Sequence, residues 1–437
     1  MNFRKLWAIC LLFPALSGFA QQAEQVKLSL SDAIEAALRQ NFDIRIAQNE
    51  LEQAATNNTI GNAGMLPSVT AVGGYNTSMS DTRLELASGQ VQDRDNALSR
   101  GLNGGIQLNW VLFDGMRMFI NKQRLQQLEN MGELALKQQV QASVAQVITT
   151  YAEVVRQQQQ LIAIDTAAAL ARVRMELAQK KFEIGTAAKT DYLQAQVDYN
   201  ASRSAALSQS AVLRQAKDSL MILMGRNQFM NYEVEDSLYL NKSLQYRELD
   251  QWLHQNLAVQ NALGEKRLSE YDLRWANGGL LPTVGLTGAY TYNRTASDAG
   301  FALFNRTVGP QAGVSISVPL FNGFNLRREQ KVARQEVFRQ DLRVQKLQNS
   351  IAARYRTAWR SYDNARKTLE LEQENISFAA ENLMIQQARF RVGVANTLEL
   401  REAETSYVTA LSRLVDAGYT LKVTETRLLE LENRLLQ

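Results

Sequence analysis

Hydrophobic and polar residues alternate in four short segments of the chain. In one of them Ile106, Leu108 and Trp110 share one face of the backbone, and Gln107 and Asn109 occupy the other. A period of two predicts β-strands, and strands of about ten residues with one apolar face are long enough to cross a bilayer when tilted. A soluble hairpin that covers a core with its apolar face is the alternative. The segments are residues 68–77, 104–112, 283–292 and 311–320.

Two much longer segments predict helices. Residues 114–184 and 322–392 contain no proline and almost no glycine, and each would reach roughly 100 Å as a single helix at about 1.5 Å per residue. The stretches 186–226 and 396–436 are also predicted to be helical, so each long helix folds back at a turn near 185 or 393. Apolar residues recur every three or four positions, which is typical of a coiled-coil seam. In the first long helix these residues are Leu136, Val140, Val144, Val147, Tyr151 and Val154.

The two halves of the chain are related by an internal repeat of about 210 residues. Three motifs recur in the same order, so the chain divides into residues 1–20, a first repeat at 21–230 and a second repeat at 231–437. Each repeat contains a helical stretch, two strands and a long helical hairpin. The recurring motifs are Gly64–Val69 with Gly279–Val284, Leu112–Gly115 with Leu320–Gly323, and Lys181–Gly185 with Arg389–Gly393.

Four strands per chain are too few to close a barrel, and a sheet that faces lipid cannot leave its edges unpaired. If the strands cross a membrane, several chains must share one barrel. Three chains would supply 12 strands, which lies within the known range of barrel sizes.

The first 20 residues predict a secretory signal peptide. Arg4 and Lys5 precede an apolar run from Leu6 to Leu16, and small residues surround the expected cleavage point at Ala20. A helix that belongs to the core is the alternative. The signal peptide predicts export, and no later run is apolar enough for a transmembrane helix.

Composition excludes several classes of function. The chain has 48 basic and 44 acidic residues among 437, one histidine and one cysteine. The near balance of charge gives no reason to expect nucleic-acid binding. Cys10 lies in the predicted signal peptide, so we expect neither disulfides nor thiolate metal sites, and His254 lies in a polar segment typical of a surface histidine. We therefore expect no catalytic site, no metal and no cofactor.

With these motifs in place, the sequence resembles the TolC-like outer-membrane efflux family over about residues 28–436. The resemblance rests on the duplication, on Leu66-Pro67 and Leu281-Pro282 before strands, and on the recurring motifs at 113–115 and 321–323. It implies a mainly helical homotrimer with a 12-stranded β-barrel in the outer membrane, continued by a periplasmic α-helical barrel. It also implies a passive exit duct for small toxic molecules or polypeptides, connected to an inner-membrane pump through a periplasmic adaptor.

The resemblance further implies a gate at the periplasmic tip. Thr190 and Asp191 match gate positions in the first repeat, and Glu399 and Glu402 match acidic positions that ring the tunnel in some relatives. Their spacing of three residues places both glutamates on one helix face, where threefold symmetry would gather six carboxylates that attract cations. Two solvated glutamates on a polar face are the alternative.

Two departures from the family concern this gate. Phe390 occupies a position where relatives carry a tyrosine, and Ala395 a position where an arginine can occur. The tyrosine hydroxyl is therefore absent, and Arg391 or Arg401 would have to replace the arginine. Gly185 and Gly393 mark the turns where the resemblance places adaptor docking, and glycines that end helices are compatible with that role.

Three classes of function follow. The first is the passive duct, whose motor must be a partner because the chain has no glycine-rich phosphate loop. The second is a structural or adhesive trimeric coiled coil of the envelope, which would not need a duplicated pair of strands. The third, an enzyme with paired carboxylates, has no convergent set of acidic residues apart from the gate candidates.

Overall fold

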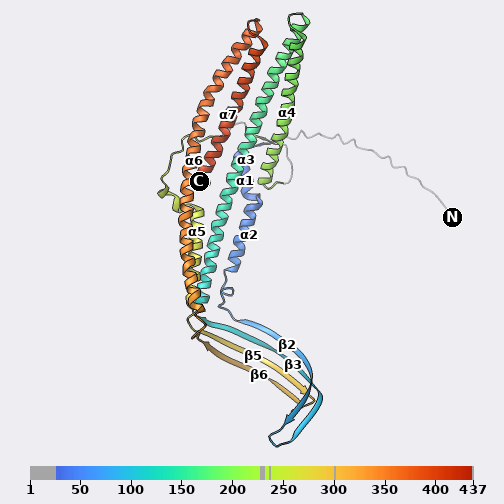
Figure 1. Ribbon diagram of the computed structural model, residues 1–437, viewed down its shortest axis with the longest axis vertical. Helices are drawn as coiled ribbons and strands as arrows, with labels where there is room; N and C mark the ends of the chain where they lie inside the picture. The colour runs from blue at the N-terminus through green and yellow to red at the C-terminus, as the bar shows by residue number, and fades with distance from the viewer. Residues whose placement is uncertain (1–25, 227–231, 236–237, 300–301, 436–437) are drawn as a thin grey trace, which may run out of the picture.

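The computed structural model describes residues 26–226, 232–235, 238–299 and 302–435. The molecule is elongated, with a body of long helices and a four-stranded sheet that extends from one end of it (Figure 1). Two helical hairpins form the opposite end. Within the described ranges, no helix combines the length and the apolar character needed to cross a membrane.

The element order is duplicated, as the recurring motifs predict. Each repeat has one helix of 67 residues that folds back into a helix of 35 residues. The first repeat contains α1 (Leu30–Gln40), α2 (Phe42–Asn57), β2 (Ser68–Glu85), β3 (Val91–Asp114), α3 (Arg117–Glu183) and α4 (Lys189–Leu223). The second contains α5 (Leu257–Gly278), β5 (Thr283–Ser297), β6 (Phe304–Ser317), α6 (Asn325–Arg391) and α7 (Thr397–Leu431), preceded by two short 3₁₀ helices, η1 (Leu249–Gln251) and η2 (Leu253–Gln255). His254 is exposed in η2, as expected.

The strands form one antiparallel sheet in the order β2-β3-β5-β6. Within the described residues, β2 and β6 are edges without a further partner. The sequence places loops at 78–101 and 293–309, and this prediction was wrong, because most of these residues continue the strands. Charged side chains interrupt the alternation of apolar and polar residues in these segments. The hydrogen bonds between strands are made by backbone groups, which every residue except proline carries, so the strands continue. Beyond the outermost pairing of β3 with β5, at Ser99 and Ser297, the β2–β3 hairpin continues alone.

A tight turn connects each hairpin to its long helix. The Asp114 Oδ1 atom accepts a hydrogen bond from the Met118 backbone N–H at 3.0 Å. Gly115 has φ +73°, and a Cβ atom at this position would lie 2.2 Å from the carbonyl oxygen of Gly278. Only glycine fits this turn, because it has no side chain and tolerates positive φ. Gly323 adopts the same conformation in the second repeat, with φ +68°.

The middle of the helical body is fastened by contacts between distant segments. Two short strands, β1 (Val26–Leu28) and β4 (Tyr232–Val234), pair in parallel, and the sequence pattern does not predict them. The Tyr151 hydroxyl of α3 donates to the Leu28 carbonyl at 2.9 Å and accepts from the Glu235 backbone N–H at 3.2 Å. A buried core of aliphatic and aromatic side chains surrounds this connection.

The duplication extends to the capping of the shorter helices. Asn41 caps the start of α2, and its amide nitrogen donates to the Leu223 carbonyl at 2.8 Å. Asn256 caps α5 and donates in the same way to the Leu431 carbonyl at 2.9 Å. Each asparagine therefore joins the start of a short helix to the end of a hairpin arm.

Candidate functional site

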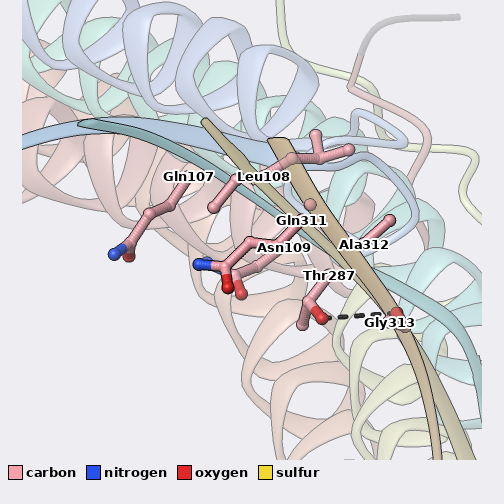
Figure 2. Close-up of a pocket in the computed structure, with 9 residues that line it drawn as sticks. Gln107, Leu108, Asn109, Thr287, Gln311, Ala312 and Gly313 are labelled. Atoms are coloured by element: carbon pink, nitrogen blue, oxygen red, sulfur yellow. Dashed lines mark hydrogen bonds between the residues drawn. The ribbon is translucent and has the colours of Figure 1, made fainter. Parts of the chain in front are cut away.

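The two faces of the sheet differ in chemistry. Gln107, Asn109 and Thr287 lie on one side of the sheet and Leu108 on the other, as Figure 2 shows. We call these the polar face and the apolar face. Both are largely exposed in the single chain, and the apolar face includes Val69, Ile106, Tyr290, Val314 and Ile316.

The polar face carries hydroxyl, amide and glycine positions, with Val72 and Ala289 as apolar exceptions. From the pairing of Ser68 with Asn109 outward to the pairing of Ser78 with Ser99, and across β5 and β6, none of its described positions is charged. Some of these residues line a hollow of about 400 Å³. The Thr287 hydroxyl donates to the Gly313 carbonyl at 3.3 Å (Figure 2). Such a surface hydrogen-bonds water and polar solutes without selecting a charge.

The two helical hairpins end in matching turns. Gly185 has φ +76°, and its N–H donates to the Phe182 carbonyl at 2.9 Å. The next N–H, of Thr186, donates to the Lys181 carbonyl at 2.8 Å, so the helix ends in a Schellman motif. Gly393 repeats the pattern with φ +79°. A Cβ atom at either glycine would meet nothing within 4 Å, and the exposed apolar side chains beside the turns are Ile184, Val392, Val394 and Leu398.

The gate candidates of the first hairpin lie in the first turn of α4. Thr190 and Asp191 are both exposed, and the Asp191 N–H donates to the Ala188 carbonyl at 3.1 Å. A carboxylate near a helix N-terminus is stabilised by the helix dipole. Both side chains are free to contact another molecule at the tip.

Phe390 and Ala395 are buried instead, at 4% and 6% exposure. They pack with Leu383, Leu400 and Ala403 of the second hairpin. The ammonium group of Lys181 in α3 lies 4.1 Å from the centre of the Phe390 ring. Phe390 therefore forms a packing contact between the two hairpins, and its side chain is not exposed at the tip.

Glu399 and Glu402 differ from each other. Asn396 caps the start of α7, because its side-chain oxygen accepts a hydrogen bond from the Glu399 backbone N–H at 2.8 Å. The Asn396 amide in turn donates to the Glu399 carboxylate at 3.1 Å. Among the described residues its Oε2 atom accepts no hydrogen bond, and Arg389 lies 3.8 Å away. Glu402 is exposed and forms no ion pair with any described residue. Glu399 thus closes a helix cap, while Glu402 is available to solvent.

A buried ion-pair network joins the hairpins close to these residues. Arg174 of α3, only 6% exposed in its side chain, pairs with Glu404 of α7 and with Asp198 of α4 at 3.1 Å. Arg401 of α7 lies 3.7 Å from the same Asp198 carboxylate. Burial lowers the pKa of the Arg174 guanidinium, and the nearby Asp198 charge opposes this effect. These four residues, which we call the Arg174 network, border a groove of about 330 Å³.

The local sequence pattern does not predict this network. Glu404 follows Leu400 and Ala403 on the buried face of α7, so a carboxylate interrupts the seam. That interruption is the signal that predicts a buried partner. The partner itself is separated by 230 residues and has no local signal. Among the described residues no three histidine, cysteine or acidic side chains gather to hold a metal ion.

Comparison with known proteins identifies the class to which this architecture belongs. Residues 33–226 and 249–434 match the family model for outer membrane efflux protein. The match covers most of the chain and both repeats, so the chain belongs to this family.

Individual relatives agree with this assignment. The chain is 22% identical to outer membrane efflux protein BepC of Brucella suis over 98% of its own length and 89% of that protein. It is 23% identical to proteases secretion protein PrtF of Dickeya chrysanthemi, over 93% and 87% of the two chains. Among solved structures, the CmeC outer membrane channel of Campylobacter jejuni superimposes with a TM-score of 0.74 at 15% identity, covering 99% of this chain and 94% of that one.

The protein is thus an outer-membrane efflux or secretion channel with a periplasmic helical extension. It is a transport protein and not an enzyme. The sheet is the part that lies in the outer membrane, and the helical hairpins extend into the periplasm. The alternative of a coiled-coil stalk without transport is therefore set aside.

Proposed function

We propose that three copies of the chain form one exit duct, with their sheets joined edge to edge into a 12-stranded barrel. The observation that carries this proposal is the pair of open edges, β2 and β6, on a sheet whose apolar face belongs in lipid. Each backbone N–H or C=O group without a hydrogen-bond partner in hydrocarbon costs roughly several kcal/mol of free energy. Both edges therefore need a partner strand. Pairing β6 of one copy with β2 of the next satisfies them all.

The hairpin tips are proposed to dock a periplasmic adaptor that connects the duct to an inner-membrane pump. Two features support this proposal. The turns at Gly185 and Gly393 have open space where a side chain would lie, and exposed apolar residues such as Ile184 and Val394 flank them. Exposed apolar groups around a rigid turn are typical of a protein interface. Small toxic molecules or polypeptides are the proposed cargo. Polypeptide cargo is supported by the relative PrtF, which is named a proteases secretion protein.

The same end is proposed to hold the gate. Thr190, Asp191, Glu399 and Glu402 contribute polar groups near the tips, and Phe390 contributes the packing between hairpins. The Arg174 network would hold the two hairpins of each chain together next to these gate residues.

The shared duct can be tested by the native mass of the full chain. The protein is extracted from the outer-membrane fraction in mild detergent and its mass is measured by light scattering. We expect three times the mass of the mature chain, because an incomplete barrel would leave strand edges exposed to lipid. A monomeric particle that still carries the folded sheet would contradict the proposal.

The gate assignment can be tested by ion selectivity in planar bilayers. The double change Glu399→Gln and Glu402→Gln removes two carboxylates per chain and keeps a side chain that can close the α7 cap. We expect the preference for cations over anions to fall by about half or more, because fewer negative charges face the passing ion.

A matched control removes the same charge from the body of α6. Glu374 and Glu381 are exposed and form no ion pair with any described residue. The change of both to glutamine should leave the cation preference close to that of the unmodified channel. Equal selectivity in the two double variants would remove the gate assignment.

A further inference from the structure

The apolar face of the sheet ends in a group of arginines. From Leu112 to Leu102 this face of β3 is apolar apart from a glycine. The ten residue-to-residue steps between them, at about 3.4 Å each and tilted by about 40°, span roughly 26 Å, which matches the thickness of the hydrocarbon layer. The next residue of β3 on the same face is Arg100. Arg100 therefore lies just past the hydrocarbon, on the side away from the helices.

Two further arginines lie at this level on the neighbouring strands. Arg294 of β5 is paired directly with Arg306 of β6. Leu102 is the β3 partner of Arg294, so Arg100 is its diagonal neighbour. Directly opposed residues have Cβ atoms about 5 Å apart, and diagonal ones about 7–8 Å. The three guanidinium groups, which we call the arginine cluster, thus extend from adjacent positions on three strands.

The cluster has no anionic partner among the residues that the structure describes. All three side chains are exposed, and none takes part in an ion pair with any residue of the described ranges. Like charges that face each other across a sheet destabilise the pairing. The Arg294 guanidinium lies 5.3 Å from the centre of the Phe304 ring, which offers some attraction but neutralises no charge. An anion from outside the chain would remove this repulsion.

The position of the cluster restricts the source of that anion. The polar face, which the cargo passes, has no charge at these levels. The arginines are instead on the face that contacts lipid, beside Tyr292 and beyond Tyr290. Tyrosines at the end of an apolar band mark the boundary with the head groups. A partner that reaches the cluster therefore comes from the membrane and not from the lumen.

We infer that Arg100, Arg294 and Arg306 form a binding site for the phosphate groups of a lipid in the outer leaflet, on the outside of the barrel. The planar guanidinium group suits phosphate, because it donates two parallel hydrogen bonds. The acyl chains of the same lipid would cover the apolar residues below, such as Ile106 and Val308. This lipid site is separate from the proposed export function, so loss of lipid binding and loss of export can be measured independently.

Lipid binding to the full chain tests this inference. The protein in mild detergent is titrated with phosphorylated glycolipid from the outer leaflet, and bound lipid is counted by native mass spectrometry. The double change Arg294→Gln and Arg306→Gln should lower bound lipid about tenfold, because two charge-assisted contacts are lost. Arg100→Gln, a single change opposite Thr77, tests the same site with less disturbance of the sheet and should lower binding about threefold.

The matched control removes the same number of positive charges from a pair of arginines outside the sheet. Arg356 and Arg360 lie four residues apart on α6, are exposed and form no ion pair with any described residue. Changing both to glutamine should leave lipid binding unchanged. Unchanged binding in the sheet variants, or an equal loss in the control, would overturn the inference.

Free phosphate separates the lipid from a site for small anions. Inorganic phosphate at millimolar concentration should displace little of the bound glycolipid, because it lacks the acyl chains that contact the apolar face. A dephosphorylated glycolipid should bind as weakly to the unmodified protein as the phosphorylated one binds to the double variant. Full displacement by inorganic phosphate would show a site for free anions and contradict the lipid assignment.

Discussion

Replacement of Arg174 by alanine is expected to lower the free energy of unfolding by about 3 kcal/mol. The change leaves Glu404 and Asp198, 9% and 16% exposed, without their buried partner, and a buried charge that loses its partner costs about 3–5 kcal/mol. Arg401 stays 3.7 Å from Asp198 and offsets part of this loss, so the lower end of the range applies. Urea denaturation in detergent, followed by helical circular dichroism, measures the effect.

A control on the same helix separates burial from charge. Arg172 pairs with Glu176 at 2.9 Å, but the two side chains are 64% and 49% exposed. An exposed pair of this spacing contributes only about 0.3–0.5 kcal/mol, so Arg172→Ala should barely change stability. Similar losses in the two variants would contradict the structural role of the Arg174 network.

Asparagine at Gly185 and Gly393 together is expected to reduce export at least about tenfold while the channel still assembles. Asparagine tolerates the left-handed conformation that both turns require, so the helices should end as before. The new side chains project into the open space where the adaptor is proposed to dock, and a misfitting group at the centre of an interface costs about 2 kcal/mol or more. Export of a toxic dye from intact cells, together with native mass, measures both effects.

Gly89 supplies the matched control for this experiment. It lies in the turn between β2 and β3 with φ +80° and has open space around it, as the hairpin glycines do. Gly89→Asn should leave export unchanged, because this turn is at the opposite end of the molecule from the tips. Normal export in the double variant Gly185→Asn and Gly393→Asn would contradict docking of the adaptor at these turns.

The sequence predicts the long helices and the strands in the membrane because both depend on local periodicity. The seam residues Val144, Val147, Tyr151 and Val154 are indeed buried, and the recurring glycine motifs place both hairpin turns. The period of two fails beyond Ser80, where Asp81 and Arg83 occur among hydrogen-bonded strand residues. The predicted strands therefore end too early on the side away from the helices. At the other end, the strand predicted at 311–320 was wrong by three residues, because β6 stops at Ser317.

Contacts between distant segments are beyond such reasoning. The pairing of β1 with β4 joins two segments of three residues, too short to show a period, across about 200 residues. The family resemblance assigns Phe390 to a gate position by its place in a motif, but the burial of its side chain depends on how the two hairpins pack. The signal peptide at 1–20 lies outside the described residues and stays a prediction.

The unequal hairpins determine what the cell presents to its surroundings. The β2–β3 hairpin continues past the end of β5, and this extension carries acidic and basic side chains of both strands. In the described chain it reaches farthest from the helices (Figure 1), so a molecule that approaches the cell from outside meets residues 81–95 first. Because this segment contacts neither the tips nor the Arg174 network, substitutions in it should change the outer surface of the cell and leave both of those regions intact.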